Sequence, residues 1–190
     1  MEVITLNEEH FNKKCIELIE KIDFNPDVVI GILQGGGIML DSIKASKKTE
    51  ANVFGFVKLK KANTSKKNKK FFVPLLKMLP YSILNKLRHI ESNKVKKSIQ
   101  SLDLNNLAKQ DIDLSSPQLD EVNSILIIDD AIDSGKTMFV VNENIKRRFP
   151  KAKIKIAVIS WTLNESIIKP DFYLYKNILV RFPWSLDFKN

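Results

Sequence analysis

Cysteine and histidine are scarce in this sequence. Cys15 is the single cysteine, and His10 and His89 are the two histidines, among 190 residues. One cysteine cannot form an internal disulfide framework and is typical of a protein of the reducing cytoplasm, where we expect this one. With only these three residues, a metal cage of cysteine and histidine is not expected. A metal bound here would be Mg²⁺ held by oxygen ligands.

Long apolar runs are also lacking. No run approaches the roughly 20 residues that cross a bilayer. The acidic start, with Glu2, Glu8 and Glu9, has no apolar core of a secretory signal. The apolar fraction of 44% indicates a soluble globular protein. A chain of this length suits one domain over residues 1–190, with room for an insertion.

Acids are rare in one segment. Between Lys58 and Lys97 the chain has thirteen Lys or Arg and a single acid, Glu91, whereas the remaining residues have a net charge of −3. An apolar, proline-broken stretch follows the first lysines. We interpret residues 58–120 as a basic, largely helical insertion or hood. Three roles are open: a lid packed on the sheet or on a partner subunit, a helix on an anionic membrane surface, or nucleic acid binding through residues 58–97.

Glycine is scarce too, and five of the six glycines lie in two places. Gly31 and Gly35–Gly37 form one group, and Gly135 stands in the other. Glycine is the residue that allows sharp turns and the close approach of backbone to a ligand. Both places are therefore candidates for a binding site.

The stretch from residue 125 to 137 joins a buried strand to polar groups at its carboxyl end. Four branched apolar residues, 125–128, predict a strand buried on both faces of a parallel sheet. Asp129 and Asp130 follow, and after a short turn Ser134-Gly135-Lys136-Thr137 opens an amphipathic helix. A helix N-terminus offers free N–H groups to a phosphate, and the acids can hold ribose hydroxyls or a divalent metal. Together they predict a sugar-phosphate site in the crevice beyond the strand ends.

Two other interpretations of this stretch explain it less completely. A Walker A loop is excluded, because it requires a glycine five residues before the Gly-Lys pair, where this chain has Asp130. A buried strand with an acidic turn and a serine-capped helix, binding no ligand, explains the turn. It does not explain the paired carboxylates beside the glycine.

The other segments predict an alternating α/β order. The pattern begins with a helix that Asn7 caps and continues through a glycine-rich turn and a βαβ unit. We expect an open, mostly parallel twisted sheet flanked by helices. The expected helices are 7–22, 38–48 and 137–149, and the expected strands are 28–33, 53–59, 125–128 and 154–160.

These motifs resemble those of the type I phosphoribosyltransferases, nearest the hypoxanthine-guanine and xanthine-guanine branch. The resemblance rests on residues 125–137, on the helix, strand and glycine-rich turn of residues 7–37, on Lys169-Pro170-Asp171-Phe172 and on Pro183-Trp184. It implies that fold, a homodimer, and Mg²⁺-assisted displacement of pyrophosphate from 5-phosphoribosyl-1-pyrophosphate (PRPP) by a nucleobase or another acceptor. A non-catalytic regulator of the same fold that senses PRPP or a nucleotide is the alternative.

The resemblance also implies roles for individual residues. Asp129 and Asp130 would hold the ribose hydroxyls and organise Mg²⁺, and Asp133 would exchange a proton with the acceptor. The loop after Asp133 would bind the 5′-phosphate, the glycine-rich turn would face the pyrophosphate, and an arm at residues 58–70 would exclude water. The substrate-binding residues implied are Asp129, Asp130, Ala131, Asp133, Ser134, Gly135, Lys136, Thr137, Gln34, Gly35, Gly36, Gly37 and Val180.

Three positions depart from the family's pattern. Gln34 stands where a basic residue commonly precedes the glycines, Ser160 where a lysine reads the exocyclic oxygen of a purine, and Leu179 where an aromatic ring stacks on the base. The acceptor is therefore left open: it is a nucleobase, or an unusual acceptor whose site the insertion forms. Trp184 is interpreted as a packing anchor rather than a ligand contact.

Overall fold

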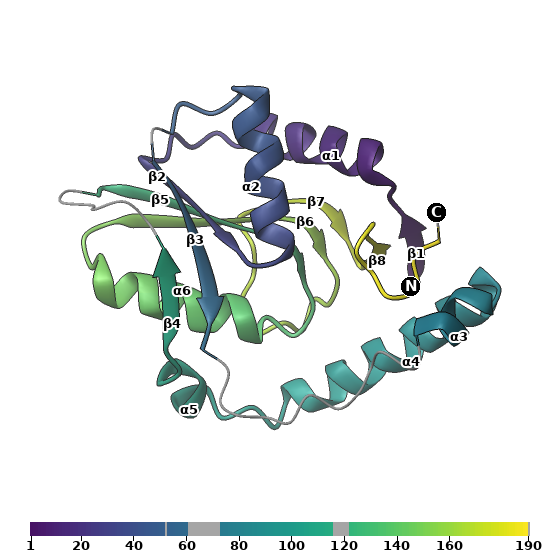
Figure 1. Ribbon diagram of the computed structural model, residues 1–190. Helices are drawn as coiled ribbons and strands as arrows, with labels where there is room; N and C mark the ends of the chain where they lie inside the picture. The colour runs from purple at the N-terminus through teal and green to yellow at the C-terminus, as the bar shows by residue number, and fades with distance from the viewer. Residues whose placement is uncertain (52, 61–72, 116–121, 190) are drawn as a thin grey trace.

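A six-stranded sheet forms the centre of the computed structural model, which describes residues 1–51, 53–60, 73–115 and 122–189. The strands are β2 (Val28–Ile32), β3 (Val53–Leu59), β4 (Ile112–Ser115), β5 (Ser124–Ile132), β6 (Lys153–Trp161) and β7 (Phe172–Lys176). Their order is β4-β3-β2-β5-β6-β7, with β4 antiparallel to β3 and the other neighbours parallel (Figure 1). The mostly parallel α/β sheet that the sequence predicted is confirmed.

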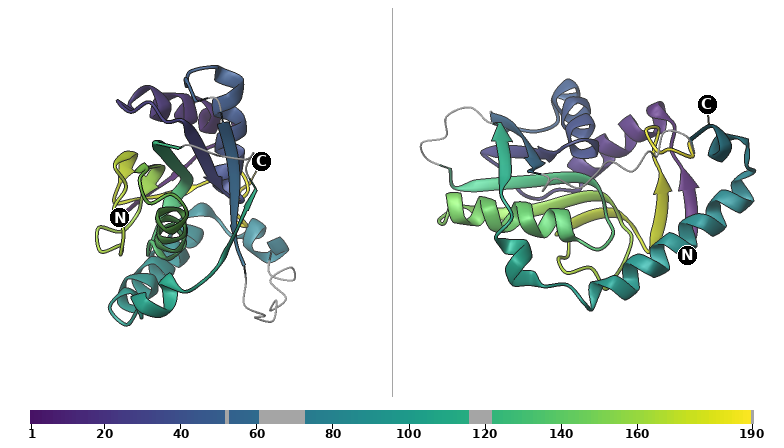
Figure 2. Two further views of the ribbon diagram at one scale, coloured as in Figure 1. Left: turned by 90° about the vertical axis from the view of Figure 1, so that its left-hand side faces the viewer. Right: turned by 60° about the horizontal axis from the view of Figure 1, so that its bottom comes forward.

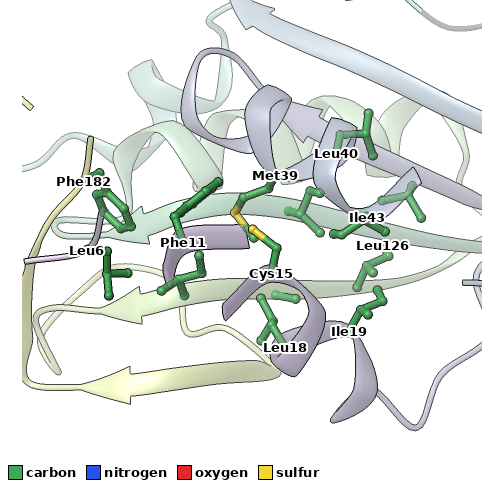
Figure 3. Packing of buried hydrophobic residues seen from close by; sticks show 14 of the residues in the cluster. Leu6, Phe11, Cys15, Leu18, Ile19, Met39, Leu40, Ile43, Leu126 and Phe182 are labelled. Carbon is green, nitrogen blue, oxygen red and sulfur yellow. The ribbon is translucent and has the colours of Figure 1, made fainter. Parts of the chain in front are cut away.

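Helices cover both faces of this sheet. Helices α1 (Glu8–Glu20) and α2 (Gly35–Ser46) lie on one face and α6 (Lys136–Arg148) on the other (Figure 1). Cys15 of α1, Met39 of α2 and Leu126 of β5 meet in the core of the first face (Figure 3). Ile125 and Ile127 point to the second face, toward α6. Residues 125–128 are all 0% exposed, which confirms the prediction of a strand buried on both faces.

The helix limits differ from the expected ones at the glycine-rich turn. Helix α1 begins as predicted after Asn7, whose side chain accepts the N–H of His10 at 2.8 Å. Helix α2, however, begins at Gly35, so the expectation of a loop through residue 37 and a helix from 38 was wrong. The physical reason is close packing of backbone, because a methyl group on Gly31 would collide with the carbonyl group of Gly36.

A second, two-stranded sheet was not predicted, and the segment expected to be largely helical contains three helices whose limits the sequence did not indicate. Strands β1 (Glu2–Thr5) and β8 (Ile178–Arg181) pair in parallel. Residues 58–120 contain α3 (Val73–Met78), α4 (Tyr81–Ile99), α5 (Leu104–Ala108) and strand β4. Figure 2 shows α4 passing beside β1 and β8 and beside the loop that follows β6. This arrangement brings one face of α4 to the carboxyl end of the main sheet.

Most of the lysine run lies outside the described residues, which omit 61–72 and 116–121. The water-excluding arm at 58–70 and the anionic partner expected for 58–97 therefore stay predictions. Among the helices that the structure describes, none has the combination of length and apolar content needed to cross a membrane.

Candidate active site

Asp129 and Asp130 lie in the last part of β5, beyond its pairing with β2, and fixed donors orient both carboxylates. Oδ1 of Asp129 accepts the backbone N–H groups of Gly36, at 3.2 Å, and of Asp130, at 2.9 Å. Oδ1 of Asp130 accepts the N–H of Ala131 at 2.8 Å, and its Oδ2 accepts the indole N–H of Trp184 at 3.0 Å. The two acids are thus held in place without a ligand.

The first turn of α2 closes against these acids because it has no side chains. A methyl group on Gly35 would collide with the carboxylate of Asp130, and one on Gly36 would collide with the carbonyl oxygen of Ile128. The glycines predicted to face a ligand therefore also determine how closely α2 approaches β5. Close approach of backbone is one of the two uses of glycine that the sequence indicated.

The loop after β5 leads into the N-terminus of α6. Gly135 has a φ of 82°, in the left-handed region that glycine adopts without strain, and α6 begins at the next residue, Lys136. The first N–H groups of a helix have no intrahelical acceptor, and Gly135 has no side chain to cap them. The start of α6 therefore offers N–H donors and a positive dipole end, which suit a phosphate. Asp133 and Thr137 are exposed on either side of it.

Burial disfavours the ionised forms of Asp129 and Asp130. Burial raises the pKa of Asp129 well above its ordinary value of 3.8, and the neighbouring charge of Asp130 raises it further. Burial also raises the pKa of Asp130, against the lowering effect of its hydrogen bonds to Asp129 and Trp184. A ligand that brings positive charge or hydroxyl donors would favour the ionised carboxylates. The pair is therefore suited to a sugar diol and to a cation.

The donor set agrees with Mg²⁺ carried by a phosphorylated substrate. In the part of the chain that the structure describes, no three His, Cys, Asp or Glu side chains come together as a protein cage for a metal. Mg²⁺ usually takes one or two carboxylates and completes its octahedron with water and substrate phosphates. Asp129 and Asp130 supply such a pair of carboxylates at one point of the backbone.

The structure shows where the three residues that depart from the family's pattern lie, together with Val180. Ser160 is buried, and its hydroxyl donates to the carbonyl oxygen of Ile178 at 2.6 Å. Leu179 and Val180 are buried in β8. Gln34 is exposed immediately before α2. None of these four side chains supplies a cation.

Trp184 connects the core to the site. Its ring stacks on Phe182, with centroids 5.2 Å apart and an interplanar angle of 3°, and meets the edge of Phe11 at 4.8 Å. This packing agrees with the interpretation of Trp184 as an anchor. The hydrogen bond from its indole N–H to Asp130 is a further role that no local pattern indicated.

The sequence did not assign four side chains of α4 to the site. A cavity of about 300 Å³ beside Asp133 is lined on one side by α4 and on the other by Leu163 and Leu179. The spacing of the four side chains is i, i+3, i+4 and i+7, which places them on one face of a helix. The sequence shows this periodicity, but periodicity alone does not indicate which residues the face packs against. The four residues are Arg88, Glu91, Ser92 and Val95.

Comparison with known families gives a match over nearly the whole chain. The phosphoribosyl transferase domain family matches residues 5–189. No curated protein sequence matches the chain.

Several solved structures share this fold at low sequence identity. A purine phosphoribosyltransferase from Pyrococcus horikoshii Ot3 has a TM-score of 0.60 at 20% identity, over 100% of this chain and 98% of that one. A xanthine-guanine-hypoxanthine phosphoribosyltransferase from Helicobacter pylori has a TM-score of 0.59 at 15% identity, over 96% and 92%. A hypothetical protein from Neisseria gonorrhoeae with bound ppGpp has a TM-score of 0.54 at 14% identity, over 96% and 89%.

Proposed function

Because this chain belongs to the phosphoribosyl transferase domain family, we propose that it transfers the phosphoribosyl group of PRPP to a nitrogenous base and releases pyrophosphate. The chain is a phosphoribosyltransferase by family, and PRPP-dependent transfer is the reaction of that family. The acceptor, the role of Mg²⁺ and the roles of single residues are the finer parts of the proposal.

One observation carries the proposal. A single strand, β5, has two oriented carboxylates near its carboxyl end, and five residues after the second of them the loop turns at Gly135 into the N-terminus of α6. Carboxylates suit the ribose hydroxyls, and helix N–H groups suit the 5′-phosphate. PRPP has both groups at the two ends of one small sugar.

The proposed chemistry is a substitution at C1 of the ribose. A ring nitrogen of the base forms a bond to C1 while the bond from C1 to the pyrophosphate oxygen breaks, and pyrophosphate leaves with the bonding electrons. The nitrogen loses its proton to the carboxylate of Asp133, which is exposed at the same end of the sheet. Such a centre passes through a cationic, oxocarbenium-like state, which the carboxylates of Asp129 and Asp130 stabilise.

Mg²⁺ would be held by Asp129 and Asp130 together with the substrate's diphosphate, and it would neutralise charge on the leaving group. The two carboxylates are already oriented by Gly36 and Trp184, so binding requires little rearrangement of the protein. We also propose that residues 58–120 act as the hood of this domain and that the protein is a homodimer, as the family resemblance implies.

The proposal is tested by pyrophosphate release from Mg·PRPP in the presence of purine bases. We expect Asp133→Asn to lower kcat by about 10²- to 10⁴-fold, because a positioned general base contributes about that factor. The KM for PRPP should change little. Asp41→Asn, at an exposed position of α2, is the matched control and should keep full activity. Equal kcat for Asp133→Asn and the wild type would remove Asp133 from the mechanism.

A regulator that senses PRPP or a nucleotide is the second candidate. The Neisseria protein that shares this fold binds ppGpp in its solved structure. Exposed Asp133 favours the enzyme, since a sensor has no need of a proton acceptor beside the sugar. Saturable binding of PRPP without pyrophosphate release for any base would favour the regulator.

A further inference from the structure

The cavity beside Asp133 has an apolar lining on the side of the sheet. Leu179 of β8 and Leu163, in the loop after β6, lie there, and Val95 of α4 faces them. A cavity of about 300 Å³ that combines three apolar side chains with four polar or charged ones has the size and character of a site for a small molecule.

Two carboxylates and one paired cation line the cavity. Glu91 and Asp133 both line it, and both side chains are exposed carboxylates. Arg88 also lines it, but its guanidinium is bound to Asp187 at 2.6 and 2.8 Å and to the carbonyl oxygen of Val180 at 3.2 Å. Among the described residues, no other cation lines the cavity. The lining therefore accepts hydrogen bonds more readily than it donates them.

Ser92 adds a polar atom that has no partner. The residue is 8% exposed, and its Oγ has no hydrogen-bond partner among the residues that the structure describes. Buried hydroxyl groups in native proteins are almost always paired, so such an exception calls for an occupant that completes it. Ser92 lines the cavity between Glu91 and Val95, where a bound molecule would supply the missing partner.

Neither of the side chains at residues 160 and 179 offers a free donor to an exocyclic oxygen. The hydroxyl of Ser160 is used by Ile178, and Leu179 is apolar. An acceptor with oxo groups on the edge that faces α4 would meet carboxylates, which repel it. An acceptor with N–H groups on that edge would pair with them.

We infer that this cavity binds the acceptor base and selects amino-substituted heterocycles, with Glu91 and Ser92 of α4 pairing with the edge that carries the N–H donors. The inference rests on the proposed function, because the cavity is an acceptor site only if PRPP occupies the neighbouring loop. According to this inference, helix α4 of the basic segment contributes to substrate specificity.

The test is equilibrium titration of the full-length protein with nucleoside 5′-monophosphates. Guanosine monophosphate has an amino group where xanthosine monophosphate has an oxo group. Adenosine monophosphate likewise has an amino group, at another ring position, where inosine monophosphate has an oxo group. In at least one pair we expect the amino member to bind about tenfold more tightly to the wild type. Glu91→Gln, whose amide also donates, should abolish that preference. Ser92→Ala should weaken binding by about fivefold, the value of one hydrogen bond.

Control variants distinguish an effect on the selection of the base from a general effect on the structure. Glu143→Gln on α6 and Ser98→Ala, whose hydroxyl bonds to the carbonyl oxygen of Val95 outside the cavity, should bind like the wild type. Ser92→Ala should melt no lower than the wild type, because the hydroxyl it loses is unpaired in the folded protein.

The outcomes separate this inference from the proposed function. Equal binding within both pairs, tighter binding of the oxo members, or an equal effect of Glu91→Gln on all four nucleotides would overturn the inference and leave PRPP transfer intact. Preference for an amino member through Glu91 in a protein that releases no pyrophosphate would overturn the transferase and leave the cavity as an amino-selective base site of a non-catalytic protein.

Discussion

Gly36 determines how closely helix α2 approaches the site acids. Its N–H donates to Asp129, and a methyl group in its place would collide with the carbonyl oxygen of Ile128 in β5. We expect Gly36→Ala to lower the free energy of unfolding by about 1–3 kcal/mol, the usual cost of overpacking. It should also weaken PRPP binding, because Asp129 moves with β5. Chemical denaturation and calorimetric titration measure the two effects.

The control for this prediction is Asp41→Ala, an exposed position in the same helix. It should change neither stability nor PRPP binding appreciably. If Gly36→Ala bound PRPP like the wild type while losing stability, the glycine would serve packing alone.

At the scale of residues, the relative positions of residues close in sequence could be predicted. Contacts between residues far apart in sequence could not. Asp129, Asp130 and Asp133 lie within one strand end and one turn, so their joint position follows from local pattern. The bond from Trp184 to Asp130 joins residues 54 positions apart, and the position of Ser92 depends on where α4 crosses the sheet. Local pattern contains no information on either, because both depend on tertiary packing.

Arg181 holds the α4 element against the rest of the protein. It is 1% exposed, and its guanidinium donates to Asp187 at 2.9 Å, to Thr5 at 2.9 Å and to Asn85 of α4 at 2.8 Å, with the ring of Tyr81 4.4 Å away. A buried charge that is fully paired in this way fixes the geometry of the elements that it joins. The face of α4 that lines the cavity is therefore held in place by these contacts.

We expect Arg181→Met to lower the free energy of unfolding by about 3–5 kcal/mol, because it leaves Asp187 buried with one fewer partner. Nucleotide discrimination by Glu91 should weaken at the same time. Urea denaturation measures the first effect. Arg148→Met, at an exposed position in the last turn of α6, is the control and should cost little. A stable Arg181→Met protein with unchanged discrimination would show that other contacts hold α4.

At the scale of elements, the main sheet followed from apolar runs and the smaller elements did not. Strand β3 and the core of β5 lie where the sequence predicted them, because long buried runs give a clear period. Strands β1, β4 and β8 have four residues each, too few for a pattern to appear. The start of α2 was misplaced because three consecutive glycines are typical of loops, and here close packing outweighs that preference.

For the whole molecule, ionisation of the site opposes stability at neutral pH. The pKa of Asp129 and of Asp130 is raised in the folded state, so the protein favours their protonated forms more than the unfolded chain does. Stability from this source is present below about pH 3.8 and is lost as the pH rises through the raised values. Function is therefore obtained at a cost in stability.

Asp187 acts in the opposite direction. Burial opposes its ionisation, but hydrogen bonds from Arg88 and Arg181 prevail and lower its pKa to about 2. Its contribution is present above the ordinary value of 3.8 and is lost as the pH falls toward 2.

We therefore expect the Asp129→Asn/Asp130→Asn double variant to be more stable than the wild type at pH 7 by about 1–2 kcal/mol. The gain should shrink as the pH falls toward 3.8, because the raised pKa of each acid favours its protonated form, and should grow as the pH rises. Urea denaturation at pH 7 and near pH 4 measures it. A double variant less stable at pH 7, or a gain independent of pH, would contradict this reading of the site.

The central claim is that the end of β5 and the start of α6 bind PRPP, and calorimetric titration of Mg·PRPP tests it most directly. The wild type should bind saturably, and the stable Asp129→Asn/Asp130→Asn variant should bind at least about 100-fold more weakly, since two charge-assisted hydrogen-bonding groups are lost. Equal affinity of the two proteins, or no binding by the wild type, would contradict the claim.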